Sequence, residues 1–133
     1  MNRIPKISIV LPVRNAAGTL PAALGSIRAQ TCAAWELVTV DDGSTDETHR
    51  ILSSAARADA HIRVLSLQPV GIVAALRAGC EAARAELIAR MDSDDRMLPE
   101  RLEQQSEYLA RHPRLGVVSC RVRNGGDPAS PAG

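Results

Sequence analysis

The sequence predicts an α/β fold in which a parallel sheet is covered by helices on both faces. Short runs rich in Val, Ile and Leu alternate with stretches of helical periodicity, in the order βαβαβαβαβ. Nearly unbroken apolar runs are typical of strands buried on both faces, as in parallel sheets. The 133 residues of the chain match the length of one domain.

The first strand and the first helix are expected within residues 7–29. Residues 7–11 form an apolar run, and we expect Pro12 to end this strand because proline lacks the N–H that a sheet ladder uses. A helix follows over residues 19–29, with Thr19 as its N-cap. Its apolar face has the spacing i, i+4, i+7 and consists of Leu20, Leu24 and Ile27.

The second strand is expected over residues 36–40, and residues 41–43 have the composition of a turn. Ser44 lies three residues before Glu47. This spacing predicts a capping box that opens a helix extending to about residue 57.

The remaining elements continue the same alternation. Strands are expected over residues 62–67, 86–91 and 116–122, and helices over residues 71–84 and 98–111. The tail over residues 124–133 is rich in Gly, Pro and Ala, and we expect it to be disordered. The chain is therefore divided into one domain over residues 1–123 and a disordered tail over residues 124–133.

Turn-forming and charged residues follow three of the predicted strands. Pro12-Val13-Arg14-Asn15 follows the first strand, residues 41–46 follow the second, and Asp92-Ser93-Asp94-Asp95 follows the fourth. Ligands of such sheets bind outside the carboxyl ends of the strands, so we expect function at this edge. The aspartates would repel one another unless a cation lies among them. The candidates are a divalent metal and the side chains of Arg14, Arg90 and Arg96.

Each acidic cluster allows two interpretations. Asp92 and Asp94 project from one side of an extended segment and offer hard oxygen ligands to Mg²⁺ or Mn²⁺ that arrives with a diphosphate. The same segment is also consistent with a turn of solvated acidic residues before a helix. Asp41, Asp42 and Ser44 suit a strand-to-helix turn and cap, or a carboxylate that accepts N–H and hydroxyl donors from a base and a ribose. The residues alone leave both questions open.

Composition and missing motifs exclude several classes of function. The 16 Lys+Arg and 15 Asp+Glu residues give a net charge of +1, so the chain lacks the excess positive charge that binds the phosphates of nucleic acids. Its two aromatic residues, Trp35 and Tyr108, are too few for a surface on which bases stack. No GxGxxG or GxxxxGK(S/T) motif is present. The three histidines are scattered, so we expect no Ser–His–Asp arrangement. No stretch approaches the roughly 20 apolar residues of a membrane span.

Several motifs combine into a specific pattern across most of the chain. They are Ile9–Asn15, Ser26 with Gln30-Thr31, the run Glu36–Thr48, Gly71 with Ala75-Leu76, and Ala89–Asp95 followed by Pro99-Glu100-Arg101-Leu102. This pattern resembles the nucleotide-sugar-binding half of glycosyltransferase family 2, from about Lys6 to Val122.

The resemblance implies a GT-A fold, that is, a Rossmann-like parallel sheet flanked by helices, truncated here. It also implies an inverting transfer of a sugar from a nucleoside diphosphate sugar, such as a UDP-sugar, to an acceptor hydroxyl. It makes Asp92 and Asp94 the metal-binding residues for Mn²⁺ or Mg²⁺, with Asp94 as the main direct ligand. It gives the donor ten binding residues: Pro12, Val13, Arg14, Asn15, Asp41, Asp42, Ser44, Arg77, Asp92 and Ser93.

The chain departs from the family pattern at three points. Val13 stands where the family often has an aromatic residue, so it offers the base only an aliphatic contact. Arg77 stands near a common Asn, where it either reaches a phosphate or is a solvated helix residue. The general base and most of the acceptor site belong to the C-terminal half of the family, so we assign no catalytic residue. The alternative function is a non-catalytic fragment that binds a nucleotide sugar.

The resemblance also sets expectations about partners and location. We expect a cytoplasmic protein, peripheral at the inner membrane through regions outside this chain. The usual setting of the family is synthesis of bacterial envelope polysaccharide or glycolipid, and the acceptor is left unassigned. Poor cover over the sheet near Val117 and Val118 favours a homodimer.

Overall fold

The computed structural model describes residues 4–120 and contains a four-stranded, fully parallel sheet. The strands are β1 (Ile7–Val13), β2 (Trp35–Asp42), β3 (Ile62–Leu67) and β4 (Leu87–Arg90), and their order in the sheet is β3-β2-β1-β4. The helices are α1 (Leu20–Arg28), α2 (Thr48–Ala58), α3 (Ile72–Ala82) and α4 (Arg101–Arg111). The predicted α/β architecture is confirmed.

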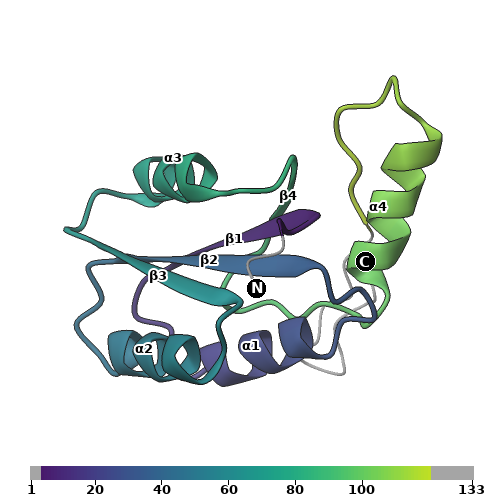
Figure 1. Ribbon diagram of the computed structural model, residues 1–133. Coiled ribbons are helices and arrows are strands. Elements are labelled where there is room, and N and C mark those ends of the chain that lie inside the picture. The colour runs from purple at the N-terminus through teal and green to yellow at the C-terminus, as the bar shows by residue number, and fades with distance from the viewer. Residues whose placement is uncertain (1–3, 121–133) are drawn as a thin grey trace, which may run out of the picture.

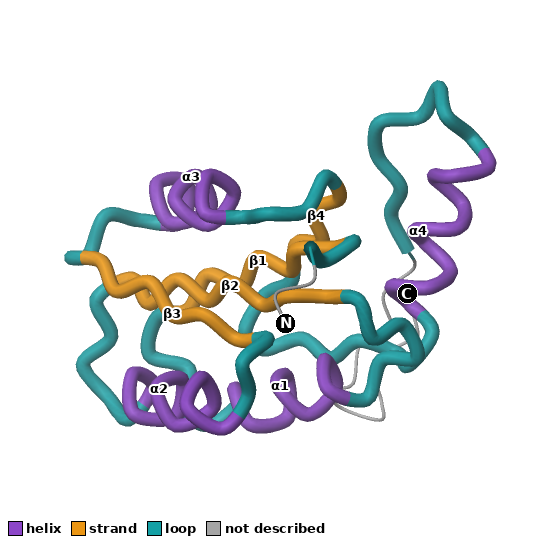
Figure 2. Tube along the Cα trace, viewed as in Figure 1, coloured by secondary structure: helices purple, strands orange, loops and turns teal. Residues whose placement is uncertain are grey.

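Helices cover both faces of the sheet. Figure 1 shows α3 on one face and α1 with α2 on the other, while α4 lies to one side of the sheet. The tube view in Figure 2 shows the regular alternation of strand and helix through β4. Within residues 4–120, no helix has both the length and the apolar character needed to cross a bilayer.

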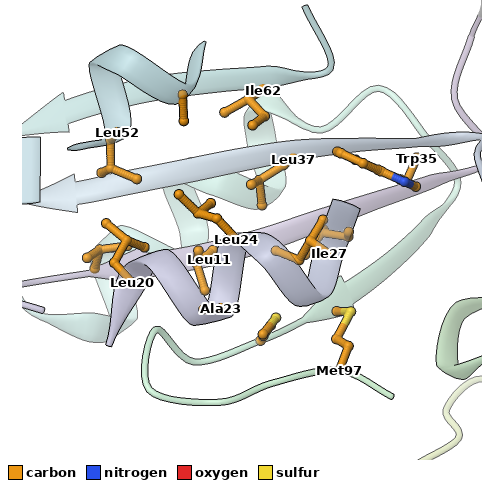
Figure 3. Close-up of a cluster of buried hydrophobic side chains, with 14 of the residues drawn as sticks. Leu11, Leu20, Ala23, Leu24, Ile27, Trp35, Leu37, Leu52, Ile62 and Met97 are labelled. Carbon is orange, nitrogen blue, oxygen red and sulfur yellow. The ribbon is translucent and has the colours of Figure 1, made fainter. Parts of the chain in front are cut away.

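Alternate residues of the two central strands enter two separate cores. Ile9, Leu11 and Leu37 pack with the apolar face of α1, as Figure 3 shows for Leu11, Leu37 and Leu24. Val38 and Val40 point to the opposite face and pack with Ala75 of α3. Because side chains alternate along a strand, neighbouring residues at the end of β2 also serve opposite layers.

The strand β1 does not stop at Pro12, as the sequence suggested, but continues to Val13. The carbonyl oxygen of Val10 accepts the N–H of Met91 on the β4 side, 3.2 Å away. Pro12 has the same parity as Val10, so its missing N–H faces the same side, beyond the end of β4. Proline therefore interrupts no ladder bond here.

The predicted fifth strand is wrong for the residues that can be examined. Residues 116–120 form no strand, and residues 121–122, like the predicted tail, lie outside the described residues. Residues 116–120 instead face β4 and α4 across a cleft of about 600 Å³. Val117 is 83% exposed. An apolar run forms a strand only where a neighbouring strand can pair with its backbone groups.

Candidate functional site

A cleft of about 450 Å³ opens at the carboxyl ends of β1 and β4. The chain runs from β1 to β2 and β3 in one direction across the sheet, and β4 then returns to the other side of β1. The cleft thus lies at the topological switch point, where α/β sheets bind their ligands. Its lining comes from the end of β1, the loops after β1 and β4, and the start of α3: Pro12, Arg14, Asn15, Ala16, Gly18, Thr19, Ile72, Asp92, Ser93 and Asp94.

The cleft brings together six of the residues that the sequence singled out, namely Pro12, Arg14, Asn15, Asp92, Ser93 and Asp94. Val13 is not among them, because its side chain is 1% exposed in the core beneath β1. The expected aliphatic contact between Val13 and a base is therefore corrected. Arg77 is exposed on α3 and does not line the cleft.

Asp42, at the end of β2, holds the start of α3. Its carboxylate is 5% exposed and accepts two backbone hydrogen bonds, from the N–H of Val70 at 2.7 Å and from that of Gly71 at 3.1 Å. Gly71 is the N-cap of α3 and has φ 91°, a left-handed conformation that favours glycine. Ile72 follows directly and lines the cleft. Asp42 thus fixes the cleft wall that α3 provides.

Asp41 faces the opposite layer of the molecule and is 4% exposed. Its Oδ1 accepts the N–H of Ser44 at 3.1 Å, and its Oδ2 lies 3.1 Å from Nδ1 of His49 on α2. Asp41 therefore serves the turn after β2, as one of the two interpretations of this segment proposed, whereas Asp42 holds a distant segment on the opposite face of the sheet.

The loop after β2 also holds the loop after β1. Three successive N–H groups of the loop after β1 donate to side chains of the loop after β2 and the first residue of α2: Asn15 to Ser44 Oγ at 3.0 Å, Ala16 to Thr48 Oγ1 at 2.9 Å, and Ala17 to Asp46 Oδ2 at 3.3 Å. Asn15 itself has φ 48° and accepts the N–H of Thr45 on its Oδ1 at 2.8 Å. These bonds keep Asn15 in a conformation that is uncommon for a residue with a side chain.

The predicted capping box of Ser44 and Glu47 is therefore wrong. The side chain of Ser44 is engaged with the loop after β1, and α2 begins only at Thr48. Asp46 Oδ1 accepts the N–H of Thr48 at 2.9 Å. Hydrogen bonds from Thr48 outweigh the effect of burial and hold the pKa of Asp46 below its ordinary value.

The predicted absence of a Ser–His–Asp arrangement is also corrected. His49 Nδ1 faces Asp41, and His49 Nε2 lies 3.3 Å from Ser53 Oγ. Ser53 lies one turn along α2 from His49, and none of these three residues lines the cleft at the switch point. We therefore assign the arrangement no nucleophilic role.

Three carboxylates lie together at the β4 side of the cleft. Asp92, Asp94 and Asp95 are exposed, and one oxygen of each lies within 4.8 Å of the others. Arg90 lies 3.7 Å from Asp92, while burial and the charges of Asp94 and Asp92 raise the pKa of Asp95. Hard oxygen donors in this number fit Mg²⁺ or Mn²⁺, so the site is compatible with the expected divalent cation.

The C-terminal end of α1 fixes the segment that follows the acidic loop. Ser26 Oγ accepts the N–H of Met97 at 3.0 Å. Gln30 donates to the carbonyl of Leu98 at 2.8 Å and accepts the N–H of Leu102 at 3.1 Å. These bonds hold residues 97–100 outside the helix, so α4 starts later than predicted and Leu98, an expected apolar anchor, is 77% exposed.

Sequence reasoning missed several residues that shape the cleft. Asp46 and Thr48 belong to a run that the sequence already singled out, but only their contacts with residues 15–17 reveal their role. Ile72 lines the cleft as the first residue of α3, directly after the N-cap Gly71. The sequence gives no specific signal for it.

Comparisons with known proteins show what the chain is similar to. The family model of glycosyl transferase family 2 matches residues 8–131. The chain is 32% identical over 122 residues to the "Uncharacterized glycosyltransferase YibD" of Escherichia coli (strain K12). That match covers 92% of this chain and 35% of YibD.

Two solved structures share the fold. S. aureus TarS 1–349 in complex with UDP-GlcNAc has a TM-score of 0.75 and 26% identity, with 81% of this chain and 32% of that chain covered. Mannosyltransferase PcManGT from Pyrobaculum calidifontis, in complex with GDP-Man and Mn²⁺, has a TM-score of 0.72 and 25% identity, with 80% and 32% covered. The chain therefore spans about a third of the length of YibD, of TarS 1–349 and of PcManGT.

Proposed function

Because the chain belongs to glycosyl transferase family 2, we propose that its cleft binds the nucleoside diphosphate sugar donor of an inverting sugar transfer. One observation carries this proposal: the loop after β1 and the carboxylates after β4 line one cleft at the switch point of the sheet. Its volume of about 450 Å³ lies in the range of small-molecule sites. The UDP-GlcNAc in TarS supports a UDP-sugar as the donor.

The two ends of the cleft suit the two ends of such a donor. Backbone and side chain at Pro12, Arg14 and Asn15 offer polar and aliphatic contacts to the base and the ribose. Asp41, Asp42 and Ser44, which the family resemblance places at the donor, are proposed to hold these walls from behind through their hydrogen bonds with the surrounding backbone. We propose the diphosphate at the opposite end, beside Asp92 and Ser93.

The carboxylates of Asp92 and Asp94 are proposed to hold Mn²⁺ or Mg²⁺, with Asp95 adjacent. A divalent cation bound there would stabilise the negative charge that develops on the leaving nucleoside diphosphate. The Mn²⁺ in the PcManGT complex supports this assignment. Among residues 4–120, Arg90 forms an ion pair with Asp92 alone of these three aspartates, and it therefore balances only part of their negative charge.

Thermal unfolding of the 133-residue chain tests the proposal. UDP-GlcNAc with Mn²⁺ is expected to raise the melting temperature more than either compound alone. Asp94→Asn should abolish the part of this rise that depends on Mn²⁺, and Glu107→Gln on α4 removes the same charge far from the cleft lining as a control. An equal rise in wild type and Asp94→Asn would remove the metal assignment.

A second candidate is a nucleotide-sugar-binding unit that transfers no sugar itself. The observation behind it is that, among residues 4–120, the cleft lining supplies groups for a donor and no residue that we assign as general base. Release of free UDP from UDP-GlcNAc in the presence of an added sugar acceptor would exclude this candidate. Binding without release would support it.

A further inference from the structure

We propose that His49 is a positioning residue, which fixes the donor-binding loop after β1 by holding the buried carboxylate of Asp41. The inference rests on the proposed function for what the loop binds. The contacts that carry the inference join α2, β2 and the loops after β1 and β2, and they do not depend on the identity of the ligand.

A continuous series of hydrogen bonds leads from His49 to the cleft. His49 Nδ1 lies 3.1 Å from Oδ2 of Asp41, whose Oδ1 accepts the N–H of Ser44 at 3.1 Å. Ser44 Oγ accepts the N–H of Asn15 at 3.0 Å, and Asn15 lines the cleft. Four residues therefore connect an exposed face of α2 to the wall of the proposed donor site.

The imidazole meets a requirement that burial imposes on Asp41. The side chain of Asp41 is 5% exposed, and a buried carboxylate needs hydrogen-bond donors on both oxygens. Because the carboxylate only accepts, Nδ1 of His49 must carry the proton that it donates. Ser53 Oγ at 3.3 Å from Nε2 and Ser66 Oγ at 3.4 Å from Nδ1 keep the ring in this orientation.

Among the described residues, His49 is the one side chain within hydrogen-bond distance of Asp41 Oδ2. Glu47 and Arg50, its neighbours on α2, form an ion pair with each other. Asp42 faces α3 from the other side of β2, where it binds Val70 and Gly71. Loss of the imidazole would leave Asp41 Oδ2 without a donor and free the carboxylate to turn away from Ser44.

The structure also explains why this loop needs an anchor. Asn15 has φ 48°, and such a conformation persists only where surrounding contacts hold it. Its N–H is fixed by Ser44 and its side chain by Thr45, and Asp41 fixes Ser44. Loosening Asp41 should therefore disturb the loop first and leave the sheet intact.

Two substitutions of His49 separate positioning from packing. His49→Asn keeps an N–H donor attached to Cγ, where Nδ1 stands, whereas His49→Leu fills similar space without a donor. We expect His49→Leu to raise the Kd of UDP in the presence of Mn²⁺ about tenfold, the equivalent of one hydrogen bond to a charged group. His49→Asn should stay within about twofold of wild type.

Amide hydrogen exchange of the ligand-free chain provides a readout that needs no nucleotide. In His49→Leu, exchange at the N–H groups of Asn15 and Ser44 should accelerate about tenfold, while that of Val38 in the sheet stays unchanged. Unchanged exchange at Asn15 and Ser44, or a uniform increase that includes Val38, would overturn the inference. Equal losses of affinity in both variants would also overturn it. Absence of UDP binding by wild type, with the exchange pattern as expected, would refute the proposed function alone.

Discussion

Gly79 controls how closely α3 approaches the sheet, and its replacement by alanine gives a sharp test of the packing. A Cβ at this position would lie 2.5 Å from Cγ1 of Val10 and 3.1 Å from Cγ2 of Val40. Carbon atoms in favourable contact are about 3.5–4.0 Å apart. Both valines are fully buried on central strands and have stiff side chains, so α3 would have to move instead.

Gly25 on α1 provides a matched control. It is also a helical glycine, but a Cβ there has no neighbour within 4 Å. Gly25→Ala should raise the free energy of unfolding by about 0.5–1 kcal/mol, because alanine is the better helix former. Gly79→Ala gains the same helix propensity but loses about 1–3 kcal/mol to overpacking. Alanine at position 79 is therefore expected to be less favourable than at position 25 by about 1–3 kcal/mol.

Urea unfolding followed by circular dichroism measures both variants on the same chain. Since the propensity gain is common to both, the difference between the two free energies of unfolding isolates the contact of α3 with the sheet. If Gly79→Ala proved as stable as Gly25→Ala, α3 would not lie against Val10 and Val40 as described.

Further predictions concern charge and the donor-binding loop. Glu36 is 2% exposed; burial raises its pKa, but hydrogen bonds from Arg84 and Arg63 outweigh this and hold the pKa below its ordinary value. Its contribution to stability is therefore complete above its unfolded pKa and is lost as the pH falls through the folded pKa. Between about pH 5 and pH 3, wild type should thus lose more free energy of unfolding than Glu36→Gln, and parallel pH profiles would contradict this. Thr48→Val removes the acceptor for the N–H of Ala16 and should lower the free energy of unfolding by about 1–3 kcal/mol. The same variant should weaken UDP binding, which calorimetry would detect; unchanged stability and affinity would show that this bond does not hold the loop.

The sequence predicted the fold because local signals and the global arrangement agree. The apolar runs of residues 7–11 and 36–40 are buried on both faces, as central strands of a parallel sheet require. The burial of Val13 could have been predicted from the alternation of side chains along β1. This residue has the same parity as Ile9 and Leu11, and it therefore enters the same core once β1 continues through Pro12.

Other features depend on contacts between distant segments and could not be read locally. The composition of residues 41–43 indicated a turn, but Asp42 is held by the backbone 28 and 29 residues away, and Asp41 by His49. The spacing of Ser44 and Glu47 indicated a capping box, yet Ser44 serves the loop after β1. The apolar run 116–122 indicated a strand, but residues 116–120 have no paired neighbour. The i, i+2 spacing of Asp92 and Asp94 was sufficient to place both on one cleft.

Paramagnetic line broadening by Mn²⁺ in the presence of UDP tests most directly whether the cleft at the switch point is the donor site. In the amide NMR spectrum of the 133-residue chain, Mn²⁺ with UDP should broaden the signals of Ser93, Asp94 and Asn15. Ile62, at the start of β3, and Ala85, just before β4, lie at the amino ends of the strands, and their signals should stay sharp. Broadening centred away from the carboxylates after β4, or spread evenly over the chain, would contradict the donor site proposed for this chain.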